Sequence, residues 1–524
     1  MGPVVARVCR MLRRLRAGRG SARWWAITAF VLFSAIYALS AGGHTYSSDE
    51  EGMFEATASM VDRQSSVLVV TDDNEGIVPV VAGRSGAPTG VSGIGNSVVA
   101  APFYVAGEAF ARLVAPSSRG VVLRVFVDFV NAPVTALGVA LVVLLGVELG
   151  ASPRSSAGVA FVYAAGTWAW PHAKTFFSEP LTALGLLAAA LALLRADRSD
   201  RARAWLLTGF FLGSALLARS TAALAGPAFV AFVLSAWWAS DRRPGPLLRR
   251  ASLACAGAVP PVLLLGAVNW WRYGSPTDLG YQSVPLNFPF REGVYGLVLS
   301  PGKSMFLYAP VIVIGLWAAV RAPTEQRPKI AFMLLIALAH IAFFARFIAW
   351  HGDHTWGPRY LTPALPFMVL PCAAVVASVR WRRAVAVAGA SGALISMLGV
   401  VMYFNQYFAI VEHSEPLRFD AGGPHYWKRM HYQPRWSPLV GHVLALPTVI
   451  DQTFRRMDGS DRDLQPFPTT ARGRYGWYFA PPQLDAWWYW IGPEHGARRL
   501  YVLLLPQVGA LAWGAARLRR GILL

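Results

Sequence analysis

Long apolar runs recur along nearly the whole chain and are separated by short polar segments. They include residues 25–40, 130–147, 181–194 and 330–345, each long enough, or nearly so, to cross a hydrocarbon layer of about 30 Å as a helix. Basic residues precede the first run, as in a signal peptide, but it lacks a clear small-residue cleavage site and further runs follow. The pattern predicts an all-α polytopic membrane protein in which this run is the first span.

Basic residues cluster between the runs and indicate how the chain is threaded. The clusters lie at 7–23, 195–203, 242–250, 321–329, 380–383 and 517–520. Positive residues favour the cytoplasmic side, so we place all of these clusters there. The spans that satisfy this rule lie near 25–41, 128–149, 156–170, 177–195, 204–218, 222–239, 250–270, 305–320, 330–350, 361–379, 384–404 and 499–516. The apolar segment 97–115 must then not cross, and Glu108 and Arg112 within it favour an interfacial helix.

This threading divides the chain into four parts. Residues 1–24 form a cytoplasmic basic tail, and 25–404 form a transmembrane core of spans 1–11. That core includes a first external loop at 42–127. Residues 405–498 form an external segment rich in aromatic residues, and 499–524 form the last span and a cytoplasmic basic end. We therefore expect a bundle of about 12 transmembrane helices with external interfacial helices.

Composition supports this interpretation and excludes others. Hydrophobic residues make up 55% of the 524 positions, above the roughly 45–50% typical of soluble domains. The net charge of +20 comes from the clusters between spans, so it does not indicate nucleic-acid binding. Three cysteines provide no disulfide framework. Few of the 48 basic residues are lysines, a bias typical of a GC-rich bacterial genome, so we expect a bacterial cytoplasmic membrane.

Acidic residues gather just after the first span. Ser48 and Glu51 have the spacing of a capping box, which would place Asp49 and Glu50 in the first turn of a surface helix. The helix dipole stabilises an ionised carboxylate there, and such a carboxylate can serve as a base. The alternative is that these acids only cap the helix.

The threading brings further polar residues to the same external face. They are His172, Lys174, Glu179, Arg219, Lys303, His351, Asp353, His354 and Arg359. Each also has a purely structural interpretation: Lys303 and Arg219 can snorkel to the interface, and Arg359 can pair with Asp353. Together they offer what is needed to deprotonate a hydroxyl and hold a phosphate. The spacing of His351, Asp353 and His354 defines no metal geometry, so no metal site is assigned, although a divalent metal stays open.

Several ordered motifs resemble the membrane glycosyltransferases of the GT-C fold, related to protein O-mannosyltransferases and aminoarabinose transferases. The motifs are the Asp49-Glu50 pair, residues 93–104, 177–181, 300–310 and 356–363. The resemblance implies a polyprenyl-phosphate sugar donor and a catalytic acid at Asp49, with Glu50 as its neighbour or substitute. Glu179 matches a second acidic position of the family. The short external segment at 405–498 lacks the large soluble domain of some relatives, so the acceptor stays open between protein, lipid and glycan.

On this resemblance we expect inverting transfer on the non-cytoplasmic face, with Asp49 as general base and Arg219, Lys303 and Arg359 as candidates to hold the donor phosphate. The alternative is a transporter or lipid flippase, which would place charge near the bilayer midplane. Mid-membrane charge is scarce here, and Arg124 and Asp128 are spaced to pair at the outer start of the second span. A noncatalytic scaffold would not explain why so many polar residues lie on the external face.

Overall fold

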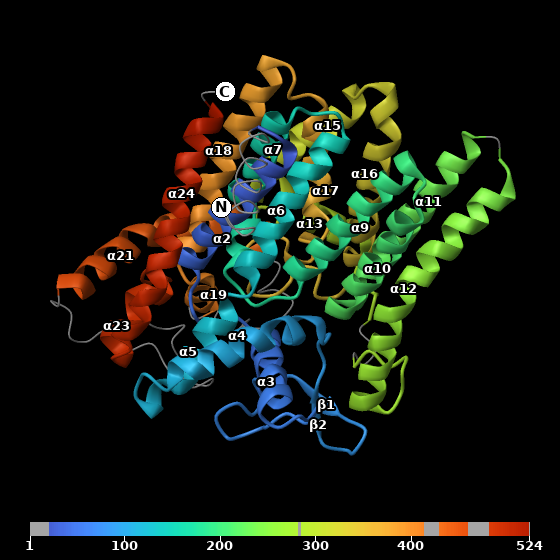
Figure 1. Ribbon diagram of the computed structural model, residues 1–524. Helices are drawn as coiled ribbons and strands as arrows, with labels where there is room; N and C mark the ends of the chain where they lie inside the picture. Colours follow the sequence, from blue (N-terminus) through green and yellow to red (C-terminus); the bar gives the residue numbers. More distant parts are fainter. Residues whose placement is uncertain (1–19, 241, 281–284, 413–428, 459–481, 523–524) are drawn as a thin grey trace, which may run out of the picture.

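The computed structural model describes residues 20–240, 242–280, 285–412, 429–458 and 482–522, and within them helices dominate (Figure 1). The bundle consists of α2 (Ala22–Ser40), α6 (Asn131–Glu148), α7 (Pro153–Ala165), α9 (Glu179–Ser199), α10 (Ala202–Ala218), α11 (Gly226–Trp238), α12 (Pro244–Tyr273), α15 (Val311–Arg321), α16 (Arg327–Phe344), α17 (Leu365–Val369), α18 (Val379–Val401) and α24 (Leu504–Ile522). These elements overlap the predicted spans one after another, and the predicted fold class is confirmed.

Eight helical segments within the described ranges are long and apolar enough to cross a membrane. Shorter apolar helices lie at Ala202–Ala218, Val311–Arg321 and Leu365–Ala374. The chain is thus an all-α, multi-pass membrane protein, whereas the number twelve stays a prediction. The basic tail predicted at 1–24 falls mostly outside the described residues.

Several predicted spans are interrupted or end early in the structure. The span at 305–320 is divided into Met305–Tyr308 and Val311–Arg321, and the helix in the span at 330–350 ends at Phe344. The run at 361–379 was expected to be one helix, but it forms α17 followed by the 3₁₀ segment η5 (Leu370–Ala374). Pro366 and Pro371 stand at the starts of these two pieces, and each proline removes a backbone donor that a continuous helix needs. The span predicted at 156–170 ends early, because α7 stops at Ala165 and α8 (Ala169–Ala173) follows after a turn.

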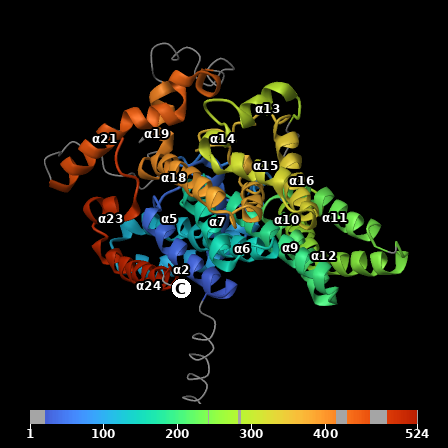
Figure 2. The same cartoon turned by 90° about the horizontal axis from the view of Figure 1, so that it is seen from above.

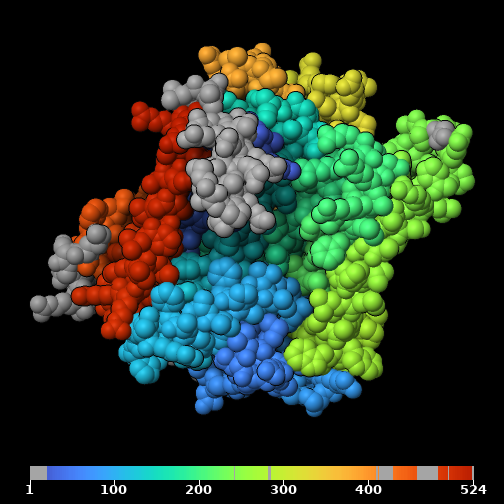
Figure 3. All heavy atoms as spheres, viewed as in Figure 1, coloured from blue at the N-terminus to red at the C-terminus, as the bar shows by residue number. Residues whose placement is uncertain are grey.

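Residues 42–128 form a layer against one end of the bundle, at the bottom of Figure 1, and we call it the loop layer. It contains α3 (Ser48–Asp62), the antiparallel hairpin of β1 (Val80–Ala82) and β2 (Pro88–Gly90), α4 (Gly95–Ala111) and α5 (Arg119–Asp128). The helix predicted at 97–115 therefore exists as α4. Figure 3 shows the loop layer as a continuous blue surface beside the outer part of α12.

The start of α3 lies one residue earlier than predicted. Its N-cap is Ser47, whose hydroxyl accepts the N–H of Glu50 at 3.3 Å. The predicted capping partner Glu51 faces inward instead, where it is buried and bonds to Thr45 and Arg124. Asp49 and Glu50 do occupy the first turn, as expected.

The remaining helices place the carboxy-terminal segment against the first span. In the bundle, α2 packs on α6, α7 and α24. The segment before α24 contains α19 (Phe404–Glu412), α21 (Pro438–Asp458) and α23 (Trp487–His495), and the short helices α13 (Phe290–Val298) and α14 (Met305–Tyr308) lie between α12 and α15. Figures 1 and 2 both show α11 and α12 projecting from one side of the bundle and α21 from another. Side chains such as Leu263 and Leu264 of α12 are more than half exposed, as expected for a surface that faces lipid.

Candidate active site

Four charged side chains form a connected group where the loop layer meets the bundle. Arg359 donates from Nη2 to Asp49 Oδ2 at 2.8 Å and from Nε to Glu179 Oε1 at 2.7 Å. Arg219 Nη1 donates to the same Glu179 oxygen at 3.0 Å. The buried carboxylate of Glu179 thus accepts hydrogen bonds from two guanidinium groups. That of Arg359 also contacts Asp49 in the first loop.

Four separate elements supply these residues. Asp49 is in the first turn of α3, and Glu179 is the first residue of α9, where the helix dipole favours a carboxylate. Arg219 follows the end of α10, and Arg359 begins the 3₁₀ segment η4 (Arg359–Leu361). Helix and turn boundaries from distant parts of the chain therefore converge at one point.

Accessibility separates the members of this group. The side chain of Arg359 is 3% exposed and that of Glu179 is fully buried, whereas that of Asp49 is 40% exposed. Burial lowers the pKa of Arg359, but Glu179 and Asp49 raise it further, so it lies well above its usual range. The guanidinium is therefore a permanent cation, and Asp49 is the carboxylate of the set that solvent can reach.

The neighbouring carboxyl of Glu50 has a different environment. It is buried and accepts the backbone N–H of Tyr46 at 2.5 Å. Burial raises the pKa of Glu50 well above its usual value, and this hydrogen bond offsets only part of the effect. The neutral acid is therefore favoured at Glu50, which makes it a poorer base than the exposed Asp49.

His172 and Lys303 lie close enough to this group to interact with it electrostatically. His172 Nε2 lies 3.0 Å from the carbonyl oxygen of Trp356, and burial lowers its pKa to about 4. Lys303 Nζ donates to the carbonyl oxygens of Thr355 and Asp353 at 2.6 and 3.1 Å. Burial is the main cause that lowers the pKa of Lys303 to about 7. At physiological pH His172 is thus neutral, and Lys303 is only partly charged.

The loop that follows α16 surrounds Lys303. Its backbone carbonyls bind the ammonium group, and His351 Nδ1 accepts the N–H of Asp353 at 3.1 Å. The side chain of Asp353 is 68% exposed and lies 3.9 Å from His354. The structural interpretation in which Arg359 pairs with Asp353 is wrong, because Arg359 uses Asp49 and Glu179.

Lys174 belongs to a second, buried cluster that includes Asp485. Its Nζ lies 3.0 Å from Asp485 Oδ2, and the other oxygen of Asp485 lies 2.7 Å from His44 Nε2. The hydroxyl of Tyr46 also donates to Asp485 at 2.8 Å. Sequence reasoning missed Asp485, His44 and Tyr46. The available signal was a single acid two residues before the aromatic run that begins at Trp487.

The pairing expected between Arg124 and Asp128 is also wrong. Arg124 binds Glu51, and Asp128 Oδ2 accepts the N–H of Gly43 at 2.7 Å. Both residues therefore bind the first loop and do not bind each other. Among the described residues, no group of three histidine, cysteine or acidic side chains is arranged to hold a metal ion.

One family model matches part of the chain. Residues 126–264 match the model of the dolichyl-phosphate-mannose-protein mannosyltransferase family, which confirms the resemblance found in the sequence for that segment. Two solved structures of ArnT from Cupriavidus metallidurans also align with 94% of this chain and 74% of their own. The one bound to undecaprenyl phosphate has 17% identity and a TM-score of 0.42, and the apo form has 15% and 0.43. No curated protein matches the chain at a significant level.

Proposed function

We propose that this protein is an inverting membrane glycosyltransferase that moves a sugar from a polyprenyl phosphate to an acceptor hydroxyl. The observation that carries the proposal is the ion-paired set of Asp49, Arg359 and Glu179, in which an accessible carboxylate lies beside a fixed cation. The family match at residues 126–264 supports the same class of reaction. The bound undecaprenyl phosphate named for one ArnT structure is of the carrier type that we propose for the donor.

In the proposed reaction, Asp49 acts as the general base. Its carboxylate takes the proton of the acceptor hydroxyl, and the acceptor oxygen forms a bond to the anomeric carbon. The acceptor oxygen attacks the face of that carbon opposite the phosphate. The bond from the carbon to the phosphate oxygen breaks, and the phosphate leaves with the electron pair. Configuration at the anomeric carbon therefore inverts. A positioned base typically contributes about 10²–10⁴-fold to the rate.

Arg359 is the best-placed candidate to hold the leaving phosphate. Glu179 fixes one edge of its guanidinium, so the group is held in position before substrate arrives, and little reorganisation is needed during reaction. Arg219 shares the same carboxylate and would add a second positive charge. Guanidinium groups suit this role because their planar donors match phosphate geometry.

In this scheme Lys303 would become fully protonated only when the donor phosphate is bound. Its ammonium group already binds backbone carbonyls, and its lowered pKa leaves it partly neutral near pH 7. An incoming phosphate would favour the protonated form, because a nearby opposite charge raises the pKa of a lysine. We propose that the site faces the non-cytoplasmic side of a bacterial inner membrane, which follows from the threading of the basic clusters.

The direct test is release of polyprenyl phosphate from a panel of short-chain polyprenyl-phosphate sugars by the purified protein, followed by mass spectrometry. Asp49→Asn should lower turnover by at least about 10²-fold while the protein still folds. The matched control is Asp62→Asn, the same change at the other end of α3, where Asp62 accepts the Tyr104 hydroxyl at 2.7 Å. The amide oxygen of the control variant can still accept this hydrogen bond, so near-normal turnover is expected.

Each outcome bears on a separate part of the proposal. Release that depends on Asp49 but not on Asp62 supports both the donor class and the base. Release that survives Asp49→Asn keeps the donor class and removes Asp49 as the base. Absence of both donor binding and release across the panel contradicts glycosyl transfer from polyprenyl phosphates.

A further inference from the structure

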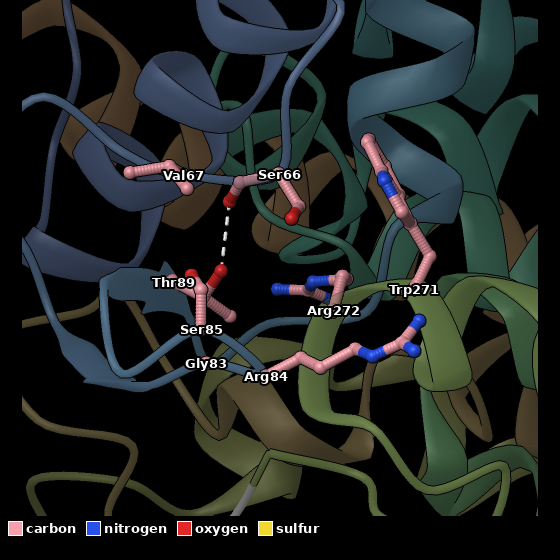
Figure 4. A pocket seen from close by; sticks show the side chains of 8 residues that line it. All are labelled: Ser66, Val67, Gly83, Arg84, Ser85, Thr89, Trp271 and Arg272. Atoms are coloured by element: carbon pink, nitrogen blue, oxygen red, sulfur yellow. Dashed lines mark hydrogen bonds between the residues drawn. The ribbon is translucent and has the colours of Figure 1, made fainter.

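A cavity of about 310 Å³ lies between the loop layer and the end of α12, apart from the charged residues of the candidate active site. Arg84 and Ser85 come from the turn between β1 and β2, and Trp271 and Arg272 come from the last turn of α12. Ser66, Val67, Gly83 and Thr89 complete the wall (Figure 4). Two arginines and three hydroxyl groups therefore face one space, and none of the described residues that line it is acidic.

The two arginines play different parts. Arg272 is 5% exposed, and its guanidinium donates to the backbone carbonyls of Gly90 and Ser92, so it ties α12 to the hairpin. Arg84 is exposed and lies 5.2 Å over the ring of Trp270. Within the described part of the chain, no hydrogen bond or ion pair links the guanidinium of Arg84 to another residue. The charge of Arg84 is therefore available to a ligand.

The position of the cavity indicates what kind of ligand it meets. Pro244–Tyr273 is a candidate membrane span, and Trp270 and Trp271 at its end are 50% and 41% exposed. Exposed tryptophans at the end of a span mark the boundary between lipid and water. The cavity therefore lies at the depth of lipid headgroups.

The same face of α12 continues into the hydrocarbon region. Leu264 precedes Trp271 by seven residues, so the two share one face of the helix, about 10 Å apart along its axis. The side chain of Leu264 is 53% exposed. A lipid whose acyl chains contact Leu264 would thus place its headgroup beside Arg84 and Trp271.

We propose that this cavity binds the headgroup of an anionic phospholipid. The phosphate would accept hydrogen bonds from Arg84 and from the hydroxyl groups of Ser66 and Ser85, while the acyl chains lie along α12. The available charge of Arg84, in a lining where none of the described residues is acidic, favours a lipid with a net negative charge over a zwitterionic one. This site is independent of the proposed glycosyl transfer.

The test is native mass spectrometry of the full chain with added phosphatidylglycerol or phosphatidylcholine. Arg84→Gln should lower the amount of bound phosphatidylglycerol about tenfold, because it removes a charged hydrogen-bond donor to the phosphate. The matched control is Arg112→Gln, an exposed arginine of the same layer that does not line the cavity. It should leave phosphatidylglycerol binding unchanged, and phosphatidylcholine should bind weakly to every variant.

Two results would overturn the proposal. Equal loss of phosphatidylglycerol from Arg84→Gln and Arg112→Gln would mean that general surface charge, not the cavity, attracts the lipid. Competition by millimolar inorganic phosphate as effective as competition by the lipid would mean that the cavity takes a soluble anion. Thermal unfolding of both variants checks the fold, and Arg272 is left intact because it holds the hairpin.

Discussion

His44 and Asp485 lie 441 residues apart in the chain, yet His44 Nε2 is 2.7 Å from Asp485 Oδ1, and both side chains are buried. Asp485 also accepts from Lys174 and from the hydroxyl of Tyr46. Tyr46 in turn donates its backbone N–H to Glu50, the neighbour of Asp49. The carboxy-terminal segment therefore helps to position the start of α3.

Asp485→Asn should destabilise the protein strongly. The change leaves Lys174 as a buried charge without its counter-ion, which typically costs about 3–5 kcal/mol of unfolding free energy. The measurement is the midpoint of thermal unfolding in detergent. Asp451→Asn is the matched control, because Asp451 forms an exposed ion pair with Arg455 on α21. Exposed pairs contribute about 0–1 kcal/mol, so a similar loss in both variants would contradict a special role for Asp485.

A glycine at the same junction provides a second prediction. Gly43 has a φ of +80°, and a Cβ there would lie 2.6 Å from the Cβ of Trp487. Gly76 has a φ of +74° with nothing within 4 Å of its added Cβ. Gly76→Ala should therefore cost about 1–2 kcal/mol from backbone strain alone. Gly43→Ala should cost clearly more, because the aromatic segment must also move.

Thermal unfolding of the two alanine variants separates strain from close packing. Equal shifts would show that the contact between Gly43 and Trp487 adds nothing to stability. A larger shift for Gly43→Ala would support tight docking of α23 onto the first loop.

The sequence predicted the bundle because an apolar run of sufficient length has few alternatives to a helix in lipid. The same reasoning failed at 361–379, where hydropathy is high but Pro366 and Pro371 begin separate helical pieces. It also placed the N-cap one residue late, since Ser47 and Ser48 are chemically equivalent and only the hydrogen bond from Glu50 N–H to the Ser47 hydroxyl distinguishes them. Backbone donors and side-chain direction, which hydropathy does not contain, decided these two cases.

For the candidate site, threading brought Asp49, Glu179, Arg219 and Arg359 to one face before any distance was known, and they do form one connected group. Which side chains touch was not predictable. From the sequence, Arg359 could pair with Asp353, which is close by, or with Asp49 and Glu179, which are far away in sequence. The partner of Lys174 lies 311 residues away, so no local pattern pointed to it.

Lys303 leads to a prediction about pH. Its pKa is about 7 in the folded protein, against 10.5 for an ordinary lysine, and burial is the main cause. Between these values the unfolded chain binds more protons than the folded one, so this residue makes stability rise as pH increases from about 7 to 10. Lys303→Met should flatten that rise in thermal unfolding measured across the window. Lys329→Met leaves Lys303 in place and should keep the rise; loss of the rise in both variants would assign it to other groups.

Arg359→Lys tests whether a fixed guanidinium is needed. Arg359 reaches Asp49 from Nη2 and Glu179 from Nε, and a lysine ammonium on a flexible stem does not reproduce this planar fork. We expect turnover to fall about 10²-fold, the usual cost of misplacing a catalytic group by about 1 Å. The comparison is Arg219→Lys, because Arg219 contacts Glu179 from a second element and should matter less to Asp49. The measurement is the rate of polyprenyl phosphate release at saturating donor. A larger loss from Arg219→Lys than from Arg359→Lys would mean that the phosphate is held chiefly by Arg219, and that the contact between Arg359 and Asp49 serves the fold.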